Sequence, residues 1–239
     1  MIGRLTRLII PICLILMSAP AWGEDLLAQG LAAQNAGKNE QAVELLGKYL
    51  KDNPQALAAA KALALALNAL DRQDEALAAL GPALARHPQD PGLLLAQGKI
   101  LAAMERRNEA IAVFSKVLGA DPKNVEALKE RGESRAQEGA FDEALKDYDR
   151  AAALAPKDPW VFQKRGMAYF CMGKYREAVG EFTAAIKLSP ESPLFYFCRG
   201  QLYLLHLKEE DKAAADFQEG CRLGHPLCCR ELERMGLKK

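Results

Sequence analysis

Histidine is scarce in this sequence, and so are the residue patterns that catalysis requires. Only three histidines occur, His87, His206 and His225, and none stands near a serine or cysteine in a nucleophile motif. There is no phosphate-binding glycine loop, no C-x-x-C-H haem attachment and no H-E-x-x-H zinc pair. The carboxylates fall mainly on the solvent side of amphipathic helical patterns, where hydration is their ordinary role. We therefore expect no enzyme activity, no catalytic residue and no cofactor.

The sequence also has no excess of charge of either sign. It holds 32 basic and 31 acidic residues, which gives a net charge of +1. Arg4 and Arg7 belong to the leader described next, so the remainder carries 30 basic and 31 acidic residues, a net charge of −1. Proteins that bind nucleic acids use a basic surface to neutralise phosphates. The charge balance therefore predicts no nucleic-acid partner.

Long apolar runs are absent after the first residues of the chain. There, two arginines precede an apolar run over 8–17, and Ala21 and Gly23 stand at the −3 and −1 positions of a cleavage site before Glu24. This order is typical of a secretory signal peptide, here over 1–23, and the run is short for a bilayer crossing. We predict a cleaved leader, a periplasmic or secreted protein and no membrane span. A retained anchor helix is the alternative.

What the sequence does contain is a repeat. Five prolines recur at an interval of 34 residues: Pro54, Pro88, Pro122, Pro156 and Pro190. Proline cannot continue a helix, and a period near 34 is typical of stacked helix-turn-helix units. The interval therefore predicts a solenoid over 24–225, with units near 23–56, 57–90, 91–124, 125–158, 159–192 and 193–225.

Small residues recur at two positions of the unit and a large residue at a third. Position eight is Gly30, Ala64, Gly98, Gly132, Gly166 and Gly200. Position twenty is Ala42, Ala76, Ala110, Ala144 and Ala178, and position twenty-four is Leu46, Leu80, Phe114, Tyr148 and Phe182. Glycine weakens a helix interior, so its return at one position indicates close contact between the two helices of a unit.

These positions resemble the tetratricopeptide repeat, whose pattern runs L-G-x2-Y, then A-x3-F, then P. The fifth unit matches best, with Gly166, Tyr169, Ala178, Phe182 and Pro190. The resemblance covers nearly the whole chain after the leader and implies an all-α, right-handed solenoid of about six helix-turn-helix repeats. The sixth unit departs from the pattern, because one extra residue near 207–211 shifts its later positions. We expect a longer turn between its two helices.

Three arginines precede the glycine of position eight, and an acid follows each of them sixteen or seventeen residues later. The pairs are Arg131 with Asp147, Arg165 with Glu181 and Arg199 with Asp216. In an antiparallel helix pair each arginine can reach its acid and form a partly buried ion pair. We assign these six side chains to the structure of the repeats rather than to ligand binding.

The cysteines after the leader all lie in the last third of the chain: Cys171, Cys198, Cys221, Cys228 and Cys229. The segment 221–229 resembles the paired cysteines of Sel-like helical repeats, in which a disulfide ties adjacent helices. The resemblance implies a Cys221–Cys229 bond, with Cys221–Cys228 as the rival, and an exported protein meets a compartment where disulfides persist. Cys198 could pair with the remaining member of the adjacent pair, and Cys171 is expected to be a buried thiol.

The same cysteines offer a metal site as a sharper alternative. Cys221, His225, Cys228 and Cys229 are four residues of types that bind zinc. Zinc sites use better-separated pairs, and two adjacent cysteines seldom chelate one ion well. We therefore expect no metal.

The sequence predicts a capping helix and tail over 226–239, with the helix over 226–237. Pro226 stands at its start, and Leu232 and Met235 lie on one side of the helical pattern. A terminal repeat leaves an apolar face uncovered, and an atypical helix with one polar side can cover it.

In tetratricopeptide proteins the first helix of each unit lines a concave groove through positions two, five, nine and twelve. Over the first four units these positions are mixed in character. At the C-terminal end they are mostly apolar: Trp160, Gln163, Met167, Phe170, Leu194, Phe197, Gln201 and Leu204. Aromatic and methionine side chains with a few amides suit a peptide with bulky side chains. The resemblance thus implies a partner-binding groove here, with coverage by the capping helix or by a second subunit as alternatives.

We therefore expect a non-catalytic scaffold of the bacterial cell envelope that binds a protein or peptide, for example in the assembly of an envelope complex. A self-associating structural oligomer is the alternative, held by the apolar end or by a free cysteine. A metal- or redox-responsive sensor built on the cysteine cluster ranks below both.

Overall fold

The computed structural model describes residues 22–237, and these residues form thirteen α-helices and one π-helical segment. In chain order they are α1 (Trp22–Asn35), α2 (Asn39–Asp52), α3 (Leu57–Ala69), α4 (Gln73–Arg86), α5 (Pro91–Ala103), α6 (Arg107–Ala120), α7 (Val125–Gln137), α8 (Phe141–Leu154), α9 (Pro159–Cys171), α10 (Tyr175–Leu188), α11 (Pro193–Gln201), η1 (Leu202–Leu207), α12 (Glu210–Arg222) and α13 (Pro226–Arg234).

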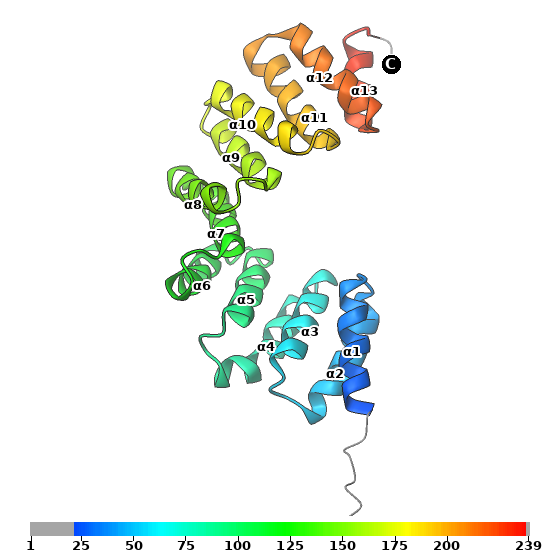
Figure 1. Ribbon diagram of the computed structural model, residues 1–239, viewed down its shortest axis with the longest axis vertical. Coiled ribbons are helices and arrows are strands. Elements are labelled where there is room, and N and C mark those ends of the chain that lie inside the picture. Colours follow the sequence, from blue (N-terminus) through cyan, green and yellow to red (C-terminus); the bar gives the residue numbers. More distant parts are fainter. Residues whose placement is uncertain (1–21, 238–239) are drawn as a thin grey trace, which may run out of the picture.

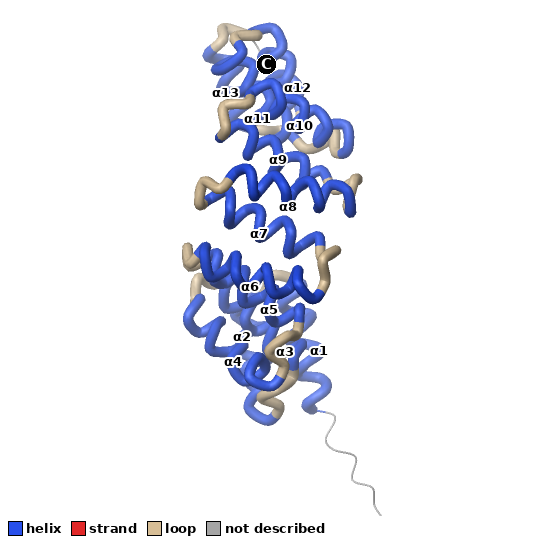
Figure 2. Tube along the Cα trace, turned by 90° about the vertical axis from the view of Figure 1, so that its left-hand side faces the viewer, coloured by secondary structure: helices blue, strands red, loops and turns tan. Residues whose placement is uncertain are grey.

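The helices pair into six hairpins that stack in chain order, with α13 covering the last one (Figure 1). Each hairpin packs against its neighbours, and Figure 2 shows the hairpins as successive layers along the long axis. The first helices of successive hairpins also touch, from α1 with α3 to α7 with α9. These first helices line the inner side of the curved stack (Figure 1). The all-α solenoid that the proline interval predicts is confirmed.

The two helices of a hairpin are joined by a short turn that contains one residue of left-handed backbone conformation. These residues are Gly37, Asp71, Glu105, Gly139, Gly173 and Lys208. A left-handed residue just after a helix lets the following N–H groups bond back to the last carbonyls. It stands at position fifteen in the first five units and at position sixteen in the last, so every unit keeps a left-handed residue in this turn.

The extra residue of the sixth unit lies in its first helix. The segment η1 continues α11 with π-helical geometry, and only Lys208 and Glu209 separate it from α12. The equivalent connection in the fifth unit runs over 172–174 and is one residue longer. Because a π-helical turn holds more residues than an α-helical turn, it absorbs the insertion. The expected longer turn is therefore wrong, and the widened helix takes its place.

The recurrent small residues allow the two helices of each hairpin to approach closely. All five alanines of position twenty are fully buried. A Cβ built on Gly98 would lie 2.4 Å from the ring of Phe114, and one on Gly132 would lie 2.6 Å from the ring of Tyr148. The absence of a side chain at position eight thus makes room for the large residue of position twenty-four.

Arginines tie the later hairpins to one another. Arg131 donates two hydrogen bonds to the Asp147 carboxylate, at 2.9 and 2.6 Å, and a third to the Ser115 hydroxyl of the preceding hairpin. Arg199 repeats this arrangement with Asp216 and Thr183.

The middle copy of this arrangement differs. Arg165 donates to Glu181 of its own hairpin and to Asp149 of the preceding one. The structure thus brings together all three arginine–acid pairs singled out in the sequence, and each arginine joins three helices of two hairpins.

The leader predicted over 1–23 lies outside the described residues, except for its last two, with which α1 begins. Its cleavage stays a prediction. Among the helices that the structure describes, none combines the length and apolar character needed to cross a membrane.

Candidate partner-binding site

The middle of the inner face carries a ladder of ion pairs between successive first helices. Each lysine reaches a carboxylate of a neighbouring hairpin: Lys99 with Glu126 at 2.6 Å and Glu130 at 3.4 Å, Lys129 with Asp158 at 3.0 Å, and Lys164 with Glu133 at 2.7 Å. These charges are satisfied within the protein, so this stretch offers a partner few unpaired groups.

Within the ladder, the pKa values of Lys99, Glu126 and Glu130 are shifted in different directions. Burial alone would lower the pKa of Lys99, but hydrogen bonds and charge from Glu126 and Glu130 raise it. Burial alone would raise the pKa of Glu126, but Lys99 and Lys129 lower it. Glu130 lies deeper, and burial raises its pKa in spite of the opposing effect of Lys99. Glu126 and Glu130 of α7 are thus placed in opposite electrostatic settings.

An apolar stripe follows the ladder along α9. Trp160, Gln163, Met167 and Phe170 lie three or four residues apart, so they share one side of the helix over about 15 Å. The exposed fraction is 48% for Trp160, 39% for Met167 and 36% for Phe170. Large side chains at such exposure along one helix face form an accessible apolar surface.

The stripe ends at a pocket between α9 and the widened end of α11. The pocket has a volume of about 210 Å³, and its walls are apolar except for one thiol, one amide and one imidazole. It is lined by Met167 and Phe170 from α9, Phe182 from α10, Phe197, Cys198 and Gln201 from α11, and Leu202, Leu205 and His206 from η1.

The structure brings together part of the groove set inferred from the sequence. Met167, Phe170, Phe197 and Gln201 line the pocket. Trp160 stands apart from it, and its ring meets the buried ring of Phe195 edge-on at 5.4 Å. Gln163 and Leu194 are partly buried and lie outside the pocket.

Leu204 does not line the pocket. It packs against the cluster around Phe217 of α12, and Leu205, which is 54% exposed, lies at the pocket instead. The π-helical turn adds one residue before this point, so the residue that faces the groove comes one place later than the repeat pattern gives.

His206 is a pocket residue that the repeat pattern missed. Its ring stacks on Tyr175 of α10, with centroids 4.0 Å apart, and meets Phe170 edge-on at 5.4 Å. The sequence signal for it is the extra residue of the sixth unit, which marks an irregular helix but gives no side-chain direction. The rings of Phe170 and His206 therefore line the pocket side by side, and Tyr175 holds His206 in place from outside the lining.

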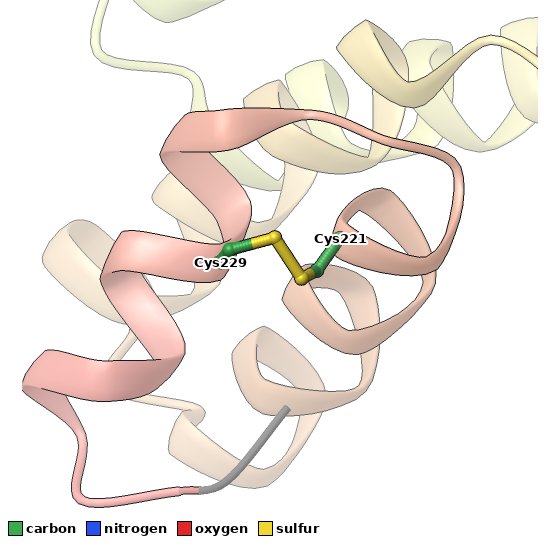
Figure 3. Close-up of a disulfide and its surroundings, with 2 residues drawn as sticks. All are labelled: Cys221 and Cys229. Atoms are coloured by element: carbon green, nitrogen blue, oxygen red, sulfur yellow. A yellow bond between two sulfur atoms is a disulfide. The ribbon is translucent and has the colours of Figure 1, made fainter.

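The cysteine-containing end supports the other side. The Sγ atoms of Cys221 and Cys229 lie at disulfide distance and tie α12 to α13 (Figure 3). At the start of α13, His225 stacks on the ring of Phe197 at 4.9 Å. Within the described residues, the residue that precedes α13 thus contacts Phe197, a pocket residue, but α13 contributes no side chain to the lining of the pocket.

The remaining thiols lie in three different settings. Cys171 is exposed, so the expectation of a buried thiol is wrong. Burial raises the pKa of Cys198, which lines the pocket, to about 11. Cys228 is buried against Gly220, where burial first and the charge of Asp216 second raise its pKa to about 12. Among the described residues no group of three or more side chains could hold a metal ion.

A tetratricopeptide repeat family model matches residues 27–91 and 95–159, and a second model for this repeat matches 166–206. No curated protein matches the sequence.

Solved structures of the same architecture are similar to this chain. PilF of Pseudomonas aeruginosa is 19% identical, with a TM-score of 0.73 over 90% of this chain and 97% of its own. A thermophilic TPR protein of Thermus thermophilus, TTC0263, is 23% identical, with a TM-score of 0.66 over 77% and 100% of the two chains. MamA of Desulfovibrio magneticus RS-1 is 22% identical, with a TM-score of 0.62 over 69% and 92%. At these identities the likeness shows the fold alone.

Proposed function

Because the chain belongs to the tetratricopeptide repeat family, which serves protein–protein interaction, we propose that it is a non-catalytic scaffold of the bacterial cell envelope. Its partner is a peptide or protein segment that binds at the C-terminal end of the inner groove. Such a scaffold would serve the assembly of an envelope complex. The apolar pocket at the end of the α9 stripe is the observation that carries this proposal.

The inner face changes from paired charges to exposed apolar side chains along the stack, and this change supports the proposed location. In the middle of the stack, the charged side chains are already paired with one another. At the C-terminal end, large apolar side chains remain exposed next to a pocket. Exposed apolar patches mark interaction sites, so the partner gains most by binding at this end.

The size of the surface favours a segment over a second copy of the chain. A fully buried aromatic side chain removes about 150–250 Å² from water. At their exposed fractions, Trp160, Met167, Phe170 and Leu205 together offer roughly 300–400 Å² of apolar area. A stable protein–protein interface buries about 800 Å² on each side. The patch is therefore too small to hold a dimer by itself, whereas it suits a short peptide.

The envelope location rests on two observations. The predicted leader indicates export, and a cysteine pair at disulfide distance suits an oxidising compartment. The layout of leader, solenoid over 24–225 and cap over 226–239 stays part of this proposal.

A capture experiment with matched variants tests the proposal. Purified protein is used to capture partners from envelope extract, and the captured proteins are compared with those of a Trp160→Ala, Met167→Ala double variant. Phe197 is unsuitable for substitution, because its ring packs against His225 and Phe217. A Leu154→Ala, Leu188→Ala variant is the control, since these side chains are similarly exposed on second helices.

We expect the stripe variant to lose a partner that the control variant keeps, while both keep wild-type helicity by circular dichroism. Retention of every partner by the stripe variant would contradict the proposed site. Light scattering of the purified protein tests the alternative, because a stable dimer that the stripe variant dissociates would favour self-association.

A further inference from the structure

We propose that the pocket beside the π-helical turn receives one aromatic side chain of an extended partner segment, whose backbone the Gln201 amide binds. This inference rests on the proposed function and specifies its partner: a peptide with a single aromatic anchor. Three observations carry it, namely the volume of the pocket, the character of its walls and the state of the neighbouring amides.

The volume fits one ring and little more. A cavity of about 150 Å³ lined by apolar side chains binds benzene. The pocket here has about 210 Å³, which leaves room for a ring and the carbon that connects it to a backbone. One water takes a share of about 30 Å³ in the liquid, so the anchor would displace several waters from an apolar site.

The walls favour a ring over an aliphatic group of similar size. Phe170, Phe182, Phe197 and His206 come from different helical segments and surround the space. Aromatic pairs are favourable beyond the area that they bury, by edge-on or offset contact. His206 is already held by its stacking on Tyr175, so its ring need not be ordered when the anchor binds.

The side-chain amides of the inner face favour an extended conformation of the partner segment. Within the part of the chain that the structure describes, the side chains of Gln163 on the α9 stripe and Gln201 in the pocket lining make no hydrogen bond to the protein. Each amide offers a carbonyl acceptor and two donors, which match the free backbone groups of an extended chain. From Met167 at the pocket to Trp160 is seven helical residues, about 10 Å, which three extended residues span. A second apolar residue of the partner, three places from the anchor, would reach Trp160.

Small amides of single amino acids test the anchor directly. Met167 is the methionine that lines the pocket, so ¹³C-methyl-methionine NMR reports on it, with Met104 in the middle of the stack as internal reference. The probes are N-acetyl-phenylalaninamide, N-acetyl-leucinamide and N-acetyl-lysinamide.

We expect a saturable shift of the Met167 methyl signal with the phenylalanine probe. The leucine probe should bind at least about threefold more weakly, the lysine probe should give no saturable shift, and Met104 should not respond.

Variants then test whether the ring of the probe binds in the pocket and whether its amides contact Gln201. Leu205→Glu sets a charge at the pocket mouth and should weaken the phenylalanine probe about tenfold. Leu154→Glu, at a similarly exposed leucine of α8, should leave its affinity unchanged. Gln201→Leu should weaken the same probe about threefold, because the probe carries two backbone-like amides.

The outcomes separate this inference from the proposed function. Equal affinity for the phenylalanine and leucine probes, no saturable shift, or no effect of Leu205→Glu would overturn the aromatic anchor. Unchanged affinity in Gln201→Leu would overturn the backbone contact. If the phenylalanine probe gives no saturable shift while the Trp160→Ala, Met167→Ala variant still loses a partner, the aromatic anchor is wrong but the groove remains supported. If the phenylalanine probe binds while that variant keeps every partner, the aromatic pocket is supported and the proposed function is contradicted.

Discussion

The glycine of position eight decides how closely the two helices of a hairpin pack. Tyr148 is 1% exposed, and its ring would lie 2.6 Å from a Cβ at residue 132. The ring is held between two helices and cannot move aside without opening the hairpin. Glycine at this position therefore contributes through the space that it leaves, and this contribution outweighs its poor helix propensity.

Gly132→Ala should therefore destabilise the protein, by a net of about 1–2 kcal/mol, because overpacking outweighs the better helix propensity of alanine. Gly180→Ala is the matched control. Gly180 lies inside α10, where an added Cβ would meet no atom within 4 Å, so the same change should raise stability by up to about 1 kcal/mol. Urea unfolding followed by circular dichroism measures both. Equal effects of the two substitutions would contradict the packing role.

The packing role of the glycines of position eight could be predicted from the sequence because they recur in successive units. A lone glycine in a helical pattern has several explanations. Here Gly98, Gly132 and Gly200 recur at one position of the unit, and a ring follows each of them sixteen or seventeen residues later: Phe114, Tyr148 and Phe217. The structure places each glycine against its ring. The same reasoning failed for Cys171, which has no counterpart in other units. Its exposure depends on the side of α9 that it occupies, and no repeated position indicated that side.

At the scale of the element, the sixth unit shows that the repeat pattern reveals an insertion but does not predict where the chain accommodates it. One extra residue between Pro193 and Ala213 is evident from the shifted pattern. Whether it enters the turn or the helix depends on competing backbone hydrogen bonds, and the pattern carries no information on these. The first helix widened and the connection to α12 is one residue shorter than its equivalent in the fifth unit, so Leu205 rather than Leu204 lies at the pocket.

Glu126 and Glu130 of α7 give a pair of predictions in which the change in stability has opposite signs. The pKa of Glu126 is lowered in the folded protein, so its charge adds stability at neutral pH that is lost as the pH falls through its folded pKa. The pKa of Glu130 is raised, so its charge opposes folding at neutral pH, and this effect vanishes on protonation.

Glu126→Gln should therefore lower the urea midpoint at pH 7, and Glu130→Gln should raise it, each by less than about 1 kcal/mol in stability. Both differences from the wild type should shrink as the pH falls, that of Glu126→Gln at lower pH than that of Glu130→Gln. Unfolding curves at several pH values from neutral down to the range where free carboxyl groups titrate, about pH 4, measure this. Shifts of the same sign at pH 7 would contradict the assignment.

At the scale of the whole molecule, the two halves of the stack are built differently. The first two hairpins and α5 are packed largely with alanine and leucine in one continuous cluster. The last hairpins contain aromatic residues, arginine–acid pairs and several small clusters. The family pattern was enough to predict apolar side chains at the C-terminal end of the inner face, where Trp160, Met167 and Phe170 are exposed. The pocket was not predictable from it, because the pocket depends on the register that the π-helical turn sets.

The disulfide should act only at the end of this stack. A loop of eight residues closed by Cys221–Cys229 stabilises by about 2.5 kcal/mol in the chain-entropy account, and α13 packs mainly against α12. In a Cys221→Ser, Cys229→Ser variant, amide exchange of α13 should accelerate by up to about two orders of magnitude.

Exchange in α1 to α6 should stay as in the wild type, because hairpins contact only their neighbours. Hydrogen-exchange mass spectrometry measures both, with Cys171→Ser, at an exposed thiol, as the control. Uniform acceleration along the chain, or an unchanged α13, would contradict local action. Because His225 at the start of α13 stacks on Phe197, increased exchange in α13 should extend to the segment of α11 that lines the pocket and stop before α9.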